Sequence, residues 1–242
     1  MKQIVITGIS SDLGKAIGAV LSADPGTQII GTMRRKMLPE ETALPNMRII
    51  EECDLTDSSA CERLGQEVAN RFKGPFGFVH SVGDFWDHVP FSEVSPDRAL
   101  HVVESHVDTL YRSLYYLIPV MKSAGGGSVV SFSCHSVNYN YPWMAAFTAA
   151  KSAVESLMRS LANEYSGDGL RFNAIVLASL RTAKVQKSKP HGDFAHFTPP
   201  EDIAPIVRFL LSKEAYLITG NAINLFVHSD EFFSSYFKRV AK

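Results

Sequence analysis

The stretch TGISSDLGKAIGAVL, residues 7–21, follows the apolar run KQIVI and decides the fold of this chain. The apolar run is rich in β-branched residues, which is typical of a buried strand. Gly8 allows a tight turn after that strand, and the helix that follows presents its first backbone amides beyond the turn. Such a strand, turn and helix suit the binding of a pyrophosphate, whereas a glycine turn without a ligand is the alternative interpretation.

Strand-like runs alternate with stretches of helical period along the whole chain. We expect strands in KQIVITG from Lys2, TQIIGTM from Thr27, RIIEECDL from Arg48, GFVHSVG from Gly77, GSVVSFS from Gly127, RFNAIVLA from Arg171 and NAINLF from Asn221. The clearest helix spans Ala145 to Tyr165, where apolar residues recur at steps of three and four. No period is found between Arg181 and Thr198, so we expect a loop over a site there. The alternation predicts an α/β fold, a doubly wound parallel sheet of about seven strands flanked by helices.

Composition limits the number of domains and the class of partner. The 242 residues, of which 45% are hydrophobic, suit one α/β domain over residues 1–242 with one sizeable core. Lys and Arg number 24 against 25 for Asp and Glu, so no charge excess points to nucleic acid or to a membrane surface. A small-molecule partner is therefore the better prediction.

The cysteines and the apolar runs bear on the cellular setting. Cys53, Cys61 and Cys134 form no C-x-x-C pair, so we expect reduced thiols and neither a disulfide framework nor a metal site. The first apolar run is too short for a secretory signal, and no run reaches the ~18 residues of a membrane span. These observations predict a cytoplasmic protein.

The first motif resembles the fingerprint T-G-x-x-x-G-x-G of the short-chain dehydrogenase/reductase family. Thr7, Gly8 and Gly14 match it, and Asp12 replaces the middle glycine. An aspartate beside a pyrophosphate is unfavourable unless its side chain turns outward or caps a backbone amide. The resemblance extends over essentially the whole chain and implies a Rossmann fold. It also implies that a nicotinamide dinucleotide is held by Gly8, Ser10, Ser11, Asp12, Leu13 and Gly14.

Residues beyond the first motif indicate which dinucleotide is bound. Arg34 and Arg35 follow the second expected strand, with no acidic residue there to bind a ribose 2′-hydroxyl. Paired guanidinium groups suit a 2′-phosphate, so NADP(H) is favoured over NAD(H), although two solvated arginines would give the same sequence. The resemblance places Asp54 and Leu55 at the adenine, unless Asp54 caps the next helix. It places Thr182 at the nicotinamide carboxamide.

The turn HSVG, residues 80–83, replaces the more common N-N-A-G of the family. It resembles the enoyl-reductase branch, in which a similar turn approaches the cofactor. The resemblance therefore implies that Ser81, Val82 and Gly83 contact the dinucleotide, and Gly83 would let the backbone come close. His80 is more often a buried, hydrogen-bonded histidine than a catalytic one.

The catalytic positions depart from the family pattern. In the family, a Tyr-x-x-x-Lys pair on one helical face carries the chemistry, together with a serine and an asparagine. Lys151 matches the lysine, which also holds the nicotinamide ribose, but Phe147 stands at the tyrosine position. Cys134, a weak hydrogen-bond donor, falls at the serine position with Ser133 just before it. His106 falls at the asparagine position.

Without that tyrosine, the family mechanism lacks a general acid, a group that typically contributes ~10²- to 10⁴-fold. Tyr139 or Tyr141, in the loop before the Lys151 helix, could restore a donor, although aromatic packing or substrate contact also explains them. His106 and His135 are further candidates with a suitable intrinsic pKa, and either could instead be structural.

Two functions remain open. The first is an NADPH-dependent reductase of a small molecule. An activated C=C bond is then a better-tolerated substrate than a ketone, because one of its protons goes to carbon and can come from water. The second is a catalytically silent NADP(H)-binding subunit that pairs with an active paralogue or senses the cofactor. Elimination with a histidine base has no specific signature.

Family members commonly assemble through two long helices, which here contain His106 and Lys151. The resemblance therefore implies a homo-dimer or homo-tetramer, or a hetero-oligomer with the paralogue in the second case. Basic residues in the expected loop indicate an anionic substrate group, although a solvated loop has the same composition; these residues are Lys184, Lys187, Lys189 and His191.

Overall fold

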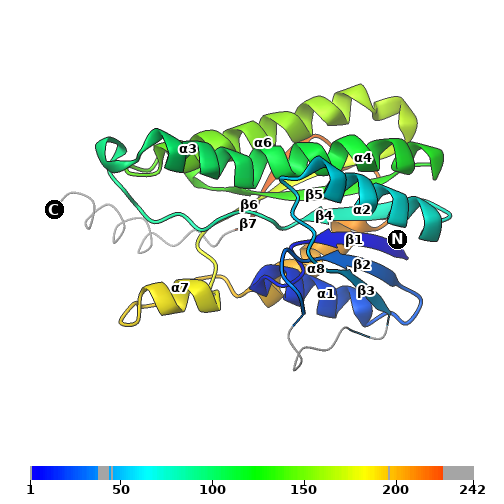
Figure 1. The fold of residues 1–242 in the computed structure, drawn as a ribbon, viewed down its shortest axis with the longest axis horizontal. Helices are drawn as coiled ribbons and strands as arrows, with labels where there is room; N and C mark the ends of the chain where they lie inside the picture. The colour runs from blue at the N-terminus through cyan, green and yellow to red at the C-terminus, as the bar shows by residue number, and fades with distance from the viewer. Residues whose placement is uncertain (1, 38–43, 45, 196, 226–242) are drawn as a thin grey trace.

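The computed structural model describes residues 2–37, 44, 46–195 and 197–225 of the chain (Figure 1). Seven strands form one sheet in the order β3-β2-β1-β4-β5-β6-β7, and all neighbouring strands are parallel. They are β1 (Gln3–Thr7), β2 (Gln28–Thr32), β3 (Met47–Ile50), β4 (Phe76–His80), β5 (Gly127–Cys134), β6 (Leu170–Leu177) and β7 (Asn221–Leu225). The predicted doubly wound sheet is confirmed. A single domain over residues 1–242 stays a prediction, because residues 226–242 lie outside the described part.

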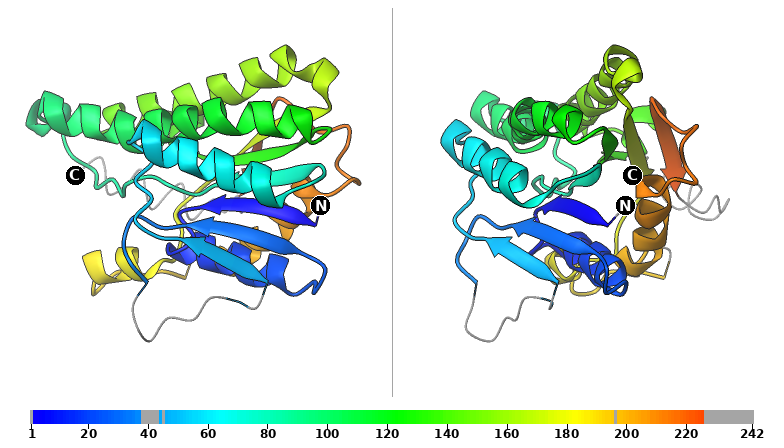
Figure 2. Two further views of the ribbon diagram at one scale, coloured as in Figure 1. Left: turned by 45° about the vertical axis from the view of Figure 1, so that its right-hand side comes forward. Right: turned by 90° about the vertical axis from the view of Figure 1, so that its right-hand side faces the viewer.

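Helices cover both faces of the sheet, as the two views in Figure 2 show. One face carries α2 (Ser58–Arg71), α4 (Thr109–Ser123) and α6 (Ala145–Glu164), and the other carries α1 (Asp12–Ser22) and α8 (Pro200–Leu211). α3 (Pro96–Val103) runs into α4 through one π-helical turn at Glu104–Asp108. Two apolar cores result, one on each face. The central strands β4, β5 and β6 are buried almost throughout, which explains their continuous apolar sequences.

Two expectations from the sequence need correction. The third strand ends at Ile50, because Glu52 adopts a left-handed conformation with φ of 49° and turns the chain away from the sheet. The segment from Arg181 to Thr198 is not all loop, since it contains the helix α7 (Ala183–Ser188). The side chain of Thr182 caps α7 by accepting a hydrogen bond from the Val185 amide at 3.2 Å. The helix α7 has only six residues, which are too few to show a helical period in the sequence.

The side on which successive strands join the sheet changes after β3, so that β4 lies next to β1. β2 and β3 lie on one side of β1, and the remaining strands lie on the other. The loops that leave the carboxyl ends of β1 and β4 therefore diverge and open a crevice, the usual binding place in such sheets. The Ser81 amide donates to the Thr7 carbonyl at 3.1 Å, which holds the HSVG turn beside the glycine turn. None of the described helices is long and apolar enough to cross a bilayer.

Candidate active site at the crevice

The glycine turn after β1 is closed by its own hydrogen bonds. The Ser11 hydroxyl donates to the Gly8 carbonyl at 2.9 Å and accepts from the Gly14 amide at 3.0 Å, which caps α1. Gly8 has φ of 75°, and a Cβ on Gly14 would lie only 2.3 Å from the Gly8 carbonyl oxygen. Both glycines are therefore required by the shape of the turn, which aims the start of α1 into the crevice.

The structure shows how the glycine turn accommodates an aspartate at position 12. Its carboxylate accepts a hydrogen bond from the Ala183 amide at 2.5 Å, across 171 positions of sequence. The side chain thus caps a backbone amide at the start of α7 and ties that helix to the glycine turn. Capping a distant amide was one of the two arrangements in which the sequence allowed an aspartate here.

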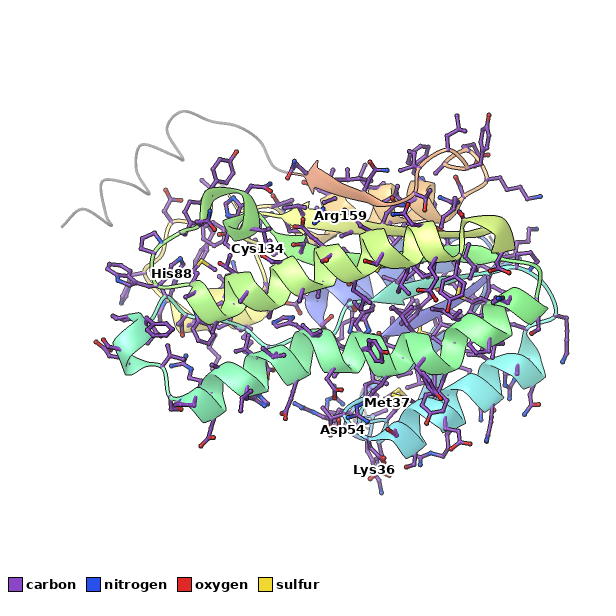
Figure 3. All side chains as sticks on the ribbon, turned by 90° about the horizontal axis from the view of Figure 1, so that it is seen from above. Lys36, Met37, Asp54, His88, Cys134 and Arg159 are labelled. Atoms are coloured by element: carbon purple, nitrogen blue, oxygen red, sulfur yellow. The ribbon has the colours of Figure 1, made fainter. Side chains whose placement is uncertain are left out.

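The arginines after β2 lie at the far end of the crevice. Arg34 and Arg35 are both exposed, and the Arg35 guanidinium donates to the Lys36 carbonyl at 2.8 Å. Figure 3 shows Lys36 and Asp54 near one another, well separated from Cys134 and His88. Lys36 and Asp54 follow β2 and β3, whereas His88 follows β4 and Cys134 ends β5.

Asp54 does not cap the helix that follows it, contrary to the alternative left open by the sequence. Its carboxylate accepts from the amide and the hydroxyl of Thr56, at 3.0 and 2.8 Å, which forms a local turn. Asp57 caps α2 instead, by accepting from the Ser59 amide. The side chain of Leu55 is buried in the core beneath the turn.

His80 is a structural residue. Its Nε2 lies 3.2 Å from the Thr109 hydroxyl, which itself donates to the Ser105 carbonyl, so Nε2 must carry the proton. Nδ1 then accepts from the Thr7 hydroxyl at 2.9 Å. Burial, followed by the charge of Lys151, lowers the pKa of His80 to about 3, so the ring is neutral at physiological pH.

The HSVG turn interlocks with His106, which lies in the π-helical turn. Gly83 has φ of 155°, and a Cβ there would lie 2.1 Å from the imidazole ring, so no other residue fits. The Nε2 of His106 donates to the Asp84 carbonyl at 3.1 Å, which leaves Nδ1 without a proton. Nδ1 is buried and has no hydrogen-bond partner among the described residues. Burial, followed by the Lys151 charge, lowers the pKa of His106 to about 2, so this ring offers a lone pair and not a proton.

Lys151 is buried on α6 and lines the cavity. Its ammonium donates to the Phe132 carbonyl at 2.9 Å and lies 5.5 Å from the centre of the Phe147 ring, one helical turn earlier. Burial lowers its pKa to about 8. The Phe147 ring is half-buried and meets the His106 ring edge to face, with centroids 5.2 Å apart.

Ser133 and Cys134 play different parts at the end of β5. The Ser133 hydroxyl donates to the buried carboxylate of Glu155 at 2.6 Å, so its single proton is already engaged. Cys134 is half-buried and packs with Phe147 against an apolar cluster around Tyr141. Both residues line the cavity, and Cys134 is the one whose donor makes no hydrogen bond to another described residue.

Tyr141 is the loop tyrosine that reaches the cavity. It is 4% exposed, and its hydroxyl forms a hydrogen bond of 3.4 Å with Nδ1 of His135. Burial, followed by the charge of His88, lowers the pKa of His135 to about 4. Tyr139 stacks on Tyr141 but does not line the cavity.

These residues surround one cavity of about 520 Å³. Its walls come from the glycine turn, the loop 81–86, the carboxyl ends of β5 and β6, the start of α6, and α7. It brings together the predicted residues Ser10, Ser11, Asp12, Leu13, Ser81, Val82, Gly83, His106, Ser133, Cys134, Tyr141, Phe147, Lys151 and Thr182. Gly8, Gly14, Arg34, Arg35, Asp54 and Leu55 are not part of its wall. This cavity includes the expected reacting end of the crevice and reaches the glycine turn.

Several cavity residues escaped the sequence analysis. Phe85, Trp86 and His88 follow Gly83 along the loop after β4, and their only signal was their place after a buried strand. The basic residues of the 181–198 segment divide: Lys184 and Lys189 line the cavity, while Lys187 and His191 do not. Leu180, Val185 and Phe197 complete that wall.

Known proteins resemble this chain over most of its length. Residues 8–225 match the profile of a family described as enoyl-(acyl carrier protein) reductase. The chain is 24% identical over 233 residues to a cyclohexanol dehydrogenase of an Acinetobacter species, covering 91% of each. It is 23% identical over 238 residues to a 3-oxoacyl-(acyl-carrier-protein) reductase of Thermotoga maritima, covering 93% of this chain and 96% of that one.

Solved structures agree with these sequence matches. A short-chain type dehydrogenase/reductase from Mycobacterium ulcerans superposes with a TM-score of 0.82 at 26% identity, covering 93% of this chain and 88% of that one. A short-chain dehydrogenase from Shigella flexneri complexed with NADP superposes with a TM-score of 0.79 at 26% identity, covering 92% and 96%.

Proposed function

Because the chain belongs to the short-chain dehydrogenase/reductase family, we propose that it is an NADP(H)-dependent oxidoreductase of a small molecule, with an unusual proton donor. The observation that carries the proposal is the buried Lys151 ammonium on the wall of the cavity that opens at the start of α1. A buried lysine without a carboxylate partner is costly, and a polar ligand in the cavity would offset that cost.

The residues present fit a dinucleotide. The closed glycine turn leaves the first amides of α1 for a pyrophosphate, and the exposed Arg34 and Arg35 suit a 2′-phosphate. The unpartnered Nδ1 of His106 offers an acceptor at the reacting end. Ser10 to Gly14, Asp54, Ser81 to Gly83, Lys151 and Thr182 would hold the rest of the cofactor. When bound, NADPH would supply a hydride to the substrate.

The side chains around the hydride acceptor favour some reactions over others. Lys151, with a pKa of about 8, is mostly protonated at neutral pH and stabilises negative charge that develops nearby. Phe147 offers no proton where the family has a phenol. We therefore propose an activated C=C bond as the preferred substrate, and a C=O bond as the second choice, because reduction of a C=C bond takes one proton directly from water.

The cavity wall also bears on the rest of the substrate. Phe85, Trp86 and Phe197 supply aromatic surface, and Lys184 of α7 and Lys189 just after it supply positive charge. The acidic residues of the wall are engaged elsewhere, Asp12 with the Ala183 amide and Asp84 with His101. An apolar body with an anionic group would complement this wall.

The outer face of α4 suits the oligomer that the resemblance implies. Tyr111 and Tyr115 are 58% and 67% exposed on that face. We propose a homo-oligomer that buries these rings. A catalytically silent subunit is not favoured, since the relatives are dehydrogenases and reductases.

The test is a fluorescence titration of the purified protein with NADPH and, separately, with NADH. We expect NADPH to bind more tightly, and the double variant R34A/R35A to weaken NADPH by about 10- to 100-fold, because charge-assisted hydrogen bonds to the 2′-phosphate are lost. NADH binding should stay unchanged, which makes it the internal control. Failure of both nucleotides to bind at millimolar concentration would overturn the proposed function.

A further inference from the structure

The groups around Lys151 and Phe147 differ in whether they can deliver a proton to a substrate oxygen. Phe147 has none, and the Ser133 proton is engaged by Glu155. His106 presents only the lone pair of Nδ1, because the proton on Nε2 is held by the Asp84 carbonyl. The Cys134 thiol is a weak donor.

Lys151 is held in place by two other contacts. One of its protons goes to the Phe132 carbonyl, and the ring of Phe147 lies beneath the ammonium. The ring covers the approach from the side on which the family would have its phenol. Lys151 is thus better placed to stabilise charge than to transfer a proton.

Tyr141 remains. Its ring is buried in the apolar cluster that also contacts Phe147 and Cys134, so the phenol enters the cavity beside the reaction centre. His135, on the same cavity wall, forms a hydrogen bond with the Tyr141 hydroxyl and packs its ring at 4.9 Å from the phenol ring. A proton donor requires this bond to run from Nδ1 of His135 to the phenol oxygen, so that the imidazole does not hold the phenol proton, while the ring packing fixes the position of the hydroxyl.

We propose that Tyr141 donates the proton to the substrate oxygen and that His135 positions it, an inference that rests on the proposed function. In the step, the substrate carbon would gain the hydride that bound NADPH supplies, and the displaced π electrons would move to the substrate oxygen. That oxygen takes the proton from the Tyr141 hydroxyl, NADPH becomes NADP⁺, and the phenolate regains its proton from water. With an enone, the resulting enol then takes a proton from water at carbon, releases its O–H proton to water and becomes the ketone.

The test uses an oxyanion probe and requires no turnover. The full chain is saturated with NADP⁺ and titrated with 4-nitrophenolate, whose absorbance reports binding and the strength of hydrogen bonding to its oxygen. The neutral 4-nitroanisole serves as the shape-matched probe without an oxyanion. We expect Y141F to weaken 4-nitrophenolate by about 10- to 100-fold and to leave 4-nitroanisole unchanged.

Control variants separate a donor from a packing role. Y139F removes a hydroxyl from the stacked neighbour that does not line the cavity, so both probes should bind as to wild type. H135N should weaken 4-nitrophenolate less than Y141F, because it loosens the phenol without removing it. Thermal unfolding of each variant checks that the fold is retained.

The possible outcomes distinguish failure of this inference from failure of the proposed function. If NADP⁺ binds and Y141F binds 4-nitrophenolate like wild type, this inference is overturned while the proposed function stands. Loss of both probes in Y141F also overturns it, because the residue would then only shape the cavity. Equal pH profiles of 2-cyclohexen-1-one reduction in Y141F and wild type, both falling above about pH 8, would assign the proton to Lys151 instead.

Discussion

The two ends of the crevice differ in how closely they follow the family pattern. At the end where we propose that adenosine binds, the glycine turn, Arg34, Arg35 and Asp54 match a pattern whose shape is set by backbone geometry and charge. At the proposed reacting end, Phe147, Cys134 and His106 all depart from it, while Lys151 is retained. The proposed function therefore treats nucleotide binding and proton transfer as separable properties, since one end can change while the other is kept.

The largest expected effect comes from returning a hydroxyl to the reacting end. In F147Y, a phenol would stand one helical turn before Lys151, where the ammonium favours its ionised form. Reduction of cyclohexanone by NADPH should rise by about 10²-fold or more. The matched control is F147L, which changes the shape without adding a donor. Equal rates for F147Y and F147L would show that the two ends do not differ as described.

A second expected effect is on stability and concerns the buried histidines His80 and His106, which lie between the two ends of the crevice. His80 and His106 have pKa values lowered to about 3 and about 2, so both are neutral in the folded protein. In the unfolded chain they protonate below about pH 6.5, so the free energy of unfolding falls as pH drops through that value. The loss approaches about 1.4 kcal/mol per pH unit for each histidine.

Urea unfolding measured at several pH values between about 7 and about 5 tests this effect. H80Q should flatten the pH dependence, whereas H191Q, at an exposed position, should leave it as in wild type. A pH dependence that H80Q does not alter would contradict the neutral, hydrogen-bonded state of His80.

The smallest expected effect is at Asp12, the one departure from the family fingerprint in the glycine turn, between the two ends of the crevice. D12N keeps an acceptor for the Ala183 amide but removes a negative charge beside the pyrophosphate, so NADPH should bind about fivefold more tightly. D12G should also lose the tether of α7, and limited proteolysis between residues 181 and 195 should then become faster. Unchanged proteolysis in D12G would show that the Asp12 contact does not hold α7.

The sequence predicted all seven strands, because buried parallel strands have continuous apolar runs bounded by glycines and polar residues. It also predicted the α6 helix within one residue, because an amphipathic helix of 20 residues shows its period clearly. The helix α7 was missed, since its stability depends on Thr182 and on the distant carboxylate of Asp12. Contacts between residues far apart in sequence leave no local pattern.

Contacts between residues far apart in sequence also limited the prediction of the site. Lys151 and Phe147 could be paired from their spacing on one helix, and the structure places the ring beneath the ammonium. The engagement of Ser133 by Glu155 and the choice of Tyr141 over Tyr139 depend on how β5, α6 and the loop between them meet. Those orientations follow from tertiary packing and not from residue type.

The close packing of Gly83 against His106 limits how this site can evolve. While the imidazole fills the space above position 83, any side chain there would clash with the ring. A smaller side chain at position 106 would remove that clash, but the φ of 155° would still strain any other residue at position 83. Two independent constraints, one from packing and one from the backbone, therefore hold the same position, so descendants of this chain should keep Gly83 even after His106 has changed.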